Sequence, residues 1–121
     1  MPRKPESALD AAVRALRAAD RSRSELDERL AARGFGAEER EAALDELQRL
    51  GYLDDGRVAR LRAERLAERG YGDAYIEADL VRRGLPAEDA LAGLQPEAER
   101  ASRQAGKGEA WLSRRGFAPD G

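Results

Sequence analysis

Apolar residues recur every three or four positions along most of the chain, which is the spacing of one face of an α-helix. The first such stripe predicts a helix over about residues 6–19. It consists of Ala8, Leu9, Ala12, Val13, Leu16 and Ala19. A second helix is expected after Ser22, because Ser22 and Glu25 have the spacing of a capping box, in which each side chain accepts a hydrogen bond from an otherwise unpaired backbone amide.

Glycine marks where the predicted helices end. Leu26 and Leu30 lie four residues apart and face the core, and Gly34 can adopt the left-handed conformation that ends many helices. Phe35 is then expected to fold back onto the helix. A third helix is predicted from Ala37 to a stop at Gly51. Residues 6–53 are therefore predicted to form a three-helix unit, preceded by a loose basic tail at residues 1–5.

The same pattern returns fifty residues later. Leu26 and Leu30 are matched by Ile76 and Leu80, and "RGF" at 33–35 becomes "RGL" at 83–85. A second three-helix unit is therefore predicted over residues 54–94, with Asp54 or Asp55 as the N-cap of its first helix. Such a period is typical of helical repeat proteins, whose units bury their apolar stripes partly against one another.

One six-residue phrase occurs three times, as "LAARGF" at 30–35, "LVRRGL" at 80–85 and "LSRRGF" at 112–117. The third copy follows the second too closely for a full unit. Residues 95–121 are therefore predicted to form a truncated third repeat with two short helices, partly mobile because Gly106 and Gly108 weaken both. A related phrase, "LAERGY" at 66–71, is out of register and is interpreted as a helix stop only.

Composition supports an all-α fold, since 38% of the residues are charged and only 5% are aromatic. The chain has 22 Lys and Arg against 24 Asp and Glu, so any basic surface must be local. It contains no Cys and no His, which excludes disulfides, thiolate nucleophiles, imidazole bases and the usual zinc ligands. We expect no catalytic residue, metal or cofactor. The apolar runs are short and interrupted by charges, so we expect a cytoplasmic protein without a membrane partner.

Arginine is the residue type with the clearest capacity for binding, because its planar guanidinium contacts phosphates and carboxylates through two hydrogen bonds. The candidates lie in the repeated phrases and on the helix that opens the second unit. They are Arg29, Arg33, Arg60, Arg65, Arg82, Arg83, Arg114 and Arg115. Their repetition predicts a basic row along the repeats. The alternative for each one is a cation that bonds the last carbonyls of a helix and needs no partner.

The combination of "ELDERLAARGF", "LGYLDD" at 50–55 and "RGYG" at 69–72, in that order, resembles the RecX family of bacterial recombination regulators. The resemblance is good over residues 8–94 and weak over 97–117. It implies tandem three-helix repeats in an elongated, curved molecule, here with two full repeats and a truncated third.

The resemblance also implies a function. RecX-like proteins bind the RecA recombinase, lodge in the groove of its filament on single-stranded DNA, and inhibit its ATPase and strand exchange. The expected protein is a non-enzymatic monomer that meets single-stranded or duplex DNA through the filament. The residues alone leave two other hypotheses open: a stand-alone DNA-binding helical module with a helix-turn-helix-like pair in each unit, or a structural repeat adaptor for another protein.

Overall fold

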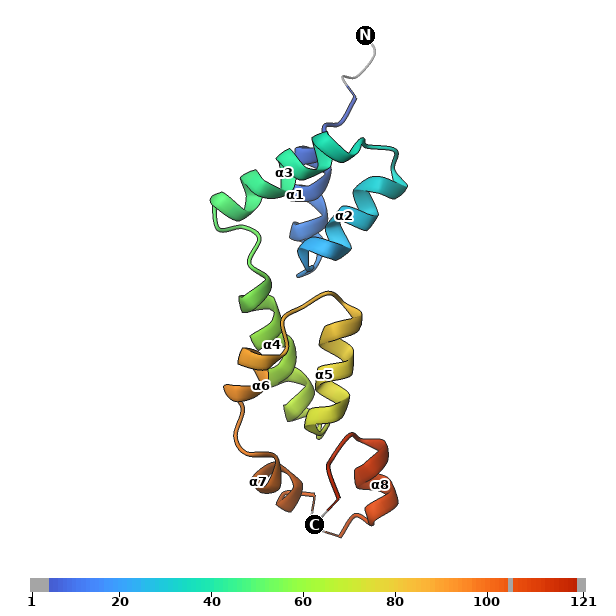
Figure 1. Ribbon diagram of the computed structural model, residues 1–121, viewed down its shortest axis with the longest axis vertical. Coiled ribbons are helices and arrows are strands. Elements are labelled where there is room, and N and C mark those ends of the chain that lie inside the picture. Colours follow the sequence, from blue (N-terminus) through green and yellow to red (C-terminus); the bar gives the residue numbers. More distant parts are fainter. Residues whose placement is uncertain (1–4, 105, 120–121) are drawn as a thin grey trace. The chain divides into compact units, whose positions relative to one another are not determined.

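The computed structural model describes residues 5–104 and 106–119, and every regular element in these residues is a helix (Figure 1). The helices are α1 (Ala8–Ala18), α2 (Arg23–Ala32), α3 (Ala37–Arg49), α4 (Asp55–Glu68), α5 (Asp73–Arg82), α6 (Glu88–Ala92), α7 (Glu97–Ser102) and α8 (Glu109–Arg114). The prediction of an all-α fold is therefore confirmed.

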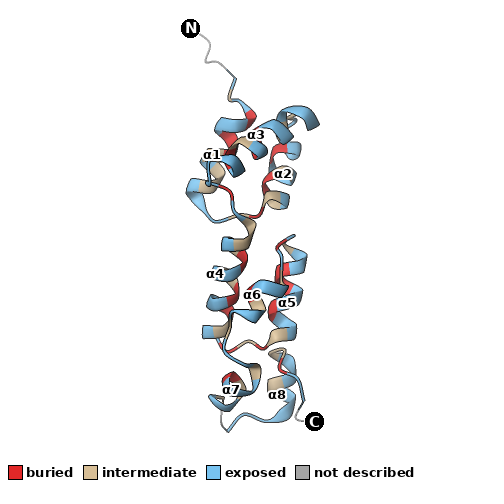
Figure 2. Cartoon of the chain, turned by 60° about the vertical axis from the view of Figure 1, so that its left-hand side comes forward, coloured by how far each residue is buried: buried red, intermediate tan, exposed pale blue. Residues whose placement is uncertain are grey.

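The chain forms two compact units, Met1–Asp55 with α1 to α3 and Gly56–Gly121 with most of α4 and all of α5 to α8. Within each unit the buried residues gather on the helix faces that turn toward one another (Figure 2). The finer division into repeats at residues 53 and 94 stays a prediction.

In the first unit, serine side chains fix where helices begin. Ser7 accepts a hydrogen bond from the Asp10 amide at 3.1 Å, so α1 begins at Ala8, slightly later than predicted. At α2 both halves of the capping box are present: Ser22 Oγ accepts from the Glu25 amide at 3.0 Å, and Glu25 accepts from the Ser22 amide at 3.2 Å. The core of this unit is built from Ala8, Ala11, Ala12, Leu26, Leu30, Ala43, Leu44, Leu47 and Leu53.

The repeated phrase is a helix-ending motif. Gly34 has a φ of +91°, its amide donates to the Ala31 carbonyl at 2.9 Å, and the Phe35 amide donates to the Leu30 carbonyl at 3.2 Å. This pair of bonds is the Schellman motif, in which a left-handed residue lets two amides satisfy the last helical carbonyls. The same pair of bonds occurs at Gly51, Gly70, Gly84 and Gly116. The prediction that "LAERGY" also ends a helix is therefore confirmed.

The second unit repeats the first closely in its middle helix. α2 (Arg23–Ala32) and α5 (Asp73–Arg82) are related by fifty residues at both ends. The third helix differs, since α3 has 13 residues and α6 has 5. Gly93 stands directly after α6 and Pro96 follows soon after, and neither residue supports a longer helix.

The prediction that Asp54 or Asp55 caps α4 needs a correction at Asp55. α4 begins at Asp55, so this residue lies inside the helix. Its carboxylate accepts a hydrogen bond from the amide of Arg23, the first residue of α2, at 2.8 Å. Asp55, the last residue of the first unit, therefore satisfies an unpaired amide at the start of α2. Asp54 is the residue that directly precedes α4.

The C-terminal segment forms two short helices, α7 and α8, as predicted, and it packs against the N-terminal end of α5. The amides of Gly72 and Ala74 donate to the carbonyls of Arg115 and Gly116 at 2.7 and 3.1 Å. A Cβ atom added to Gly72 would lie 2.4 Å from the Gly116 carbonyl carbon, so the two backbones touch. We call these contacts the α5–α8 joint. The partial mobility expected for this segment stays a prediction.

Candidate functional site

The structure divides the eight candidate arginines into two groups. Four of them, Arg29, Arg60, Arg65 and Arg114, are exposed, and their side chains form no ion pair or hydrogen bond with any residue that the structure describes. The side chains of the other four, Arg33, Arg82, Arg83 and Arg115, contact residues of their own unit. The first group is therefore available to a partner without any rearrangement of the fold.

Arg33 and Arg29 lie on the rim of a groove between α1 and α2. The groove is lined by Ala11, Arg14, Ala15, Ala18, Leu26, Arg29, Leu30 and Arg33, and we call it the α1–α2 groove. Arg33 pairs with Glu6 at 2.8 Å, and its guanidinium lies 5.5 Å from the centre of the Phe35 ring.

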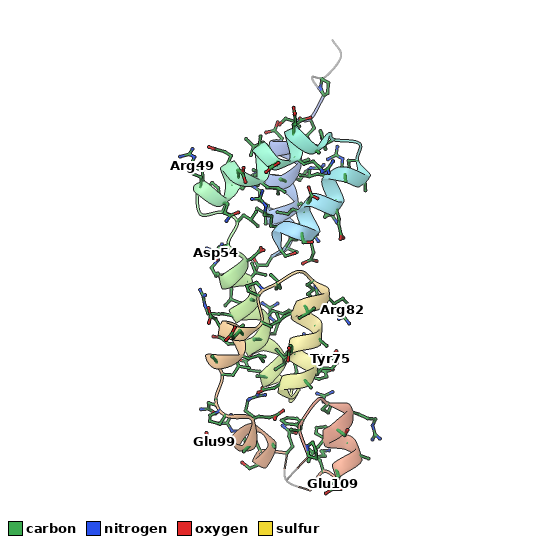
Figure 3. The ribbon with its side chains drawn as sticks, in the orientation of Figure 1. Arg49, Asp54, Tyr75, Arg82, Glu99 and Glu109 are labelled. Carbon is green, nitrogen blue, oxygen red and sulfur yellow. The ribbon has the colours of Figure 1, made fainter. Side chains whose placement is uncertain are left out.

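Arg82 and Arg83 belong to an ion cluster centred on Asp79, a carboxylate that is only 2% exposed. Arg62 binds this carboxylate through two nitrogens, at 2.9 and 3.1 Å. Arg82 and Arg83 approach it at 3.0 and 3.2 Å, and Arg82 extends outward from the end of α5 (Figure 3). The hydrogen bond from Arg62, followed by the charges of Arg62, Arg83 and Arg82, holds the pKa of Asp79 below its usual value although burial acts in the opposite direction.

Arg62 is absent from the candidates that sequence reasoning selected. A signal for it exists in the printed sequence, because Asp79 falls between Ile76 and Leu80 on the apolar stripe of α5. A buried carboxylate needs a cationic partner. The preceding helix carries arginines at several positions, and Arg62 is the one whose side chain reaches Asp79 with two nitrogens.

Arg115 is part of the α5–α8 joint. Its guanidinium lies 3.8 Å from the centre of the Tyr71 ring and 5.3 Å from that of Trp111, and it donates hydrogen bonds to the carbonyls of Arg69 and Gly70. Tyr71 in turn stacks on Tyr75, with ring centres 4.0 Å apart. This matches the alternative in which an arginine bonds final carbonyls, although the carbonyls follow α4 and not its own helix.

Arginines at matching places in the repeated phrase therefore have different surroundings. Arg33 pairs with a carboxylate of the N-terminal segment, Arg83 with a buried carboxylate of its own helix, and Arg115 with backbone carbonyls. The basic row along the repeats stays a prediction. The support for such a row comes from Arg29, Arg60, Arg65 and Arg114, whose side chains form no ion pair or hydrogen bond with any described residue.

No described helix has both the length and the apolar content needed to cross a membrane. Residues 5–104 and 106–119 also contain no group of three or more acidic residues arranged to hold a metal ion.

The described residues define an all-α protein of two compact units, each with exposed arginines. Comparison with known proteins gives the family. The model of the first three-helix domain of RecX matches residues 8–47. A "Regulatory protein RecX" of Thermus thermophilus is 45% identical over 91 residues, which are 75% of this chain and 62% of that protein. This chain thus spans less than two thirds of that relative.

A longer match is found with "Regulatory protein RecX" of Leptothrix cholodnii, which is 35% identical over 127 residues that cover 90% of this chain and 80% of that protein. The chain belongs to the RecX family of regulatory proteins. The crystal structure of RecX from Lactobacillus salivarius has the same fold, with a TM-score of 0.79 at 20% identity over 92% of this chain and 86% of that one.

Proposed function

We propose that this protein regulates the RecA recombinase by binding its filament on single-stranded DNA and mainly inhibiting ATPase activity and strand exchange. Membership of the RecX family supports the regulatory part of this proposal. The observation that carries it in this chain is the group of exposed arginines without an intramolecular partner among the described residues, present in both units. They are Arg29, Arg60, Arg65 and Arg114.

These four arginines are the proposed principal anchors, because binding costs them no existing contact. Arg33, Arg82, Arg83 and Arg115 can contribute only by sharing or exchanging the partners that they already have. A filament offers both carboxylates and phosphates, and arginine binds either through paired hydrogen bonds.

The proposed mechanism is steric and electrostatic, and the protein itself catalyses no reaction. A monomer acting in the cytoplasm wedges between neighbouring RecA subunits and alters filament growth or nucleotide turnover. DNA is met through the filament and not bound independently. This separates the proposal from a stand-alone DNA-binding module, which needs no RecA.

The test measures RecA's DNA-stimulated ATPase and its filament length at increasing concentrations of the purified protein. The wild type is expected to inhibit both. Arg29→Ala/Arg60→Ala should raise the half-inhibitory concentration roughly tenfold, because two charge-assisted contacts are lost. The matched control, Arg17→Ala/Arg69→Ala, removes two exposed arginines outside the candidate set and should stay within about twofold of the wild type. Unchanged ATPase and filament length at excess wild-type protein would sink the proposal.

A gel shift with a single-stranded oligonucleotide and no RecA distinguishes the proposed function from that of a stand-alone DNA-binding module. Phosphate-driven binding weakens steeply as salt rises. Strong, salt-sensitive binding of the oligonucleotide by the protein alone, together with no effect on RecA, would replace the proposed function with that of an independent DNA-binding module.

A further inference from the structure

The α1–α2 groove combines an apolar floor with a cationic rim. Its floor is aliphatic: Ala15 and Ala18 are accessible at its surface, and Leu26 and Leu30, which are 0% and 2% exposed, lie beneath them. Three arginines surround the floor, Arg14 and Arg33 with side chains 66% and 44% exposed, and Arg29, which is also exposed. No lining residue is acidic. The groove therefore offers apolar contact and positive charge within the reach of one short segment.

Glu6 shows how this rim receives a carboxylate. Arg14 donates to it through Nε at 2.9 Å and Nη2 at 2.8 Å, and Arg33 approaches the same carboxylate at 2.8 Å. The hydrogen bonds from Arg14 and then Arg33 hold the pKa of Glu6 below its ordinary value. Two of the three rim arginines are thus already arranged around a single anionic group, while Arg29 has no partner among the described residues.

The second unit lacks this arrangement. A shift of fifty residues replaces Arg14 by Glu64, Ala18 by Glu68 and Arg29 by Asp79. Asp79 gathers Arg62, Arg82 and Arg83 into an ion cluster. Two of the three arginines of the groove, Arg14 and Arg29, are therefore acidic at the matching positions of the second unit, while Arg33 is matched by Arg83.

We propose that the α1–α2 groove docks an acidic segment of a partner protein, a run of carboxylates that carries an aliphatic side chain. Glu6 occupies part of the rim until this segment competes for Arg14 and Arg33. The proposal deepens the proposed function, on which it rests for the use of Arg29 and Arg33 as anchors. A protein segment fits better than nucleic acid, because a phosphate backbone leaves the aliphatic floor without contacts whereas a leucine among carboxylates uses both features.

The test needs no RecA. The full chain is titrated into a fluorescein-labelled peptide of sequence EEELEDE, and fluorescence anisotropy is followed at low and moderate salt. Control probes are QQQLQNQ, which has no charge, EEEGEDE, which has no aliphatic anchor, and a single-stranded oligothymidine of equal net charge. The acidic peptide with leucine should bind best, and its affinity should fall as salt rises.

Three variants locate the binding. Arg29→Ala should weaken peptide binding about two- to fivefold through loss of one exposed charged contact. Glu6→Gln should strengthen it, because Arg14 and Arg33 no longer serve a charged internal competitor. Arg17→Ala removes an exposed arginine on the same helix as Arg14 that lies outside the groove, and it should leave affinity unchanged. Circular dichroism should show equal helicity in all three.

Equal binding of the neutral peptide, or equal effects of Arg29→Ala and Arg17→Ala, would overturn the groove as an acidic-segment site. Binding of only the oligothymidine, with dependence on Arg29, would replace the protein partner with nucleic acid. The outcome is independent of the RecA assay: peptide binding without any effect on RecA contradicts the proposed function alone, and RecA inhibition without peptide binding contradicts this inference alone.

Discussion

Single charged residues decide how each unit uses its arginines. At equivalent places in α2 and α5, the first unit has Arg29, which is exposed, and the second has Asp79, which is buried. The carboxylate at position 79 draws Arg62, Arg82 and Arg83 to itself. The arginine at position 29 leaves the corresponding surface cationic. The difference between Arg29 and Asp79 thus decides whether this part of the unit is an internally paired ion cluster or a surface that can bind anions.

Replacing Asp79 by Asn is expected to destabilise the second unit. The change removes the acceptor of several charge-assisted hydrogen bonds and leaves cations near a buried amide. The arginines are partly exposed and can turn toward water, so the expected cost is about 1–3 kcal/mol in the free energy of unfolding at pH 7. Urea denaturation followed by circular dichroism measures it. Asp45→Asn is the control, since Asp45 is 63% exposed and pairs only with Arg23 among the described residues, and it should change stability little.

The stabilisation by Asp79 should also depend on pH. Because the folded state lowers the pKa of this carboxyl, its contribution is complete above the ordinary pKa of Asp, about 3.9, and is lost as pH falls through the lower folded-state value. The difference between wild type and Asp79→Asn should therefore shrink below about pH 4. A difference that stays constant down to pH 2 would show that shape, and not charge, makes Asp79 important.

At the scale of elements, the same phrase serves two purposes. At Gly34 it ends a helix in open space, because a Cβ atom there would meet nothing within 4 Å. At Gly116 it ends a helix and also lies against α5, because a Cβ atom there would be 2.4 Å from the Tyr75 amide nitrogen. The third copy of the phrase therefore holds the end of α8 against α5 within the second unit.

Gly116→Ala is expected to open the α5–α8 joint. The new methyl group would overlap the backbone of α5, and the φ of +90° at this position is unfavourable for alanine. Trp111 is the only tryptophan in the chain, so a red shift of its emission and faster tryptic cleavage after Arg114 or Arg115 report the opening. Gly106→Ala is the control, since Gly106 also has a φ of +90° but nothing within 4 Å of an added Cβ. Equal effects of the two substitutions would show that backbone strain alone acts.

Helix boundaries were predictable because their signals are local. The capping box at Ser22 and the glycines that end helices each involve residues within a stretch of six, and the structure confirms both. The α5–α8 joint was not predictable in this way, since it joins Gly72 to Gly116 across a long stretch of chain and depends on the absence of two side chains. The residue type and its repetition were enough to select the candidate arginines from the sequence. Only the folded structure shows that Arg29 is exposed without a partner among the described residues, whereas Arg115 is bonded to backbone carbonyls.

At the scale of the whole molecule, the two units have separate apolar cores. Leu26 and Leu30 belong to one cluster, Ile76 and Leu80 belong to the other, and among the described residues no buried residue belongs to both. A small unit with its own core has only a few kcal/mol of stability. A substitution in one core should therefore lower the stability of its own unit much more than that of the other.

Leu26→Ala tests this organisation, because Leu26 is 0% exposed and a buried Leu→Ala change costs about 2–5 kcal/mol. Hydrogen–deuterium exchange should rise across α1 to α3 and change little in α5 and α8. Ile76→Ala, at the equivalent position and also 0% exposed, should give the reverse pattern. Exchange that rises equally in both units for either substitution would mean that the chain unfolds as one cooperative body. In the expected case, a partner that binds only the first unit, through the α1–α2 groove, will protect α1 and α2 without stabilising Asp79 and its arginines.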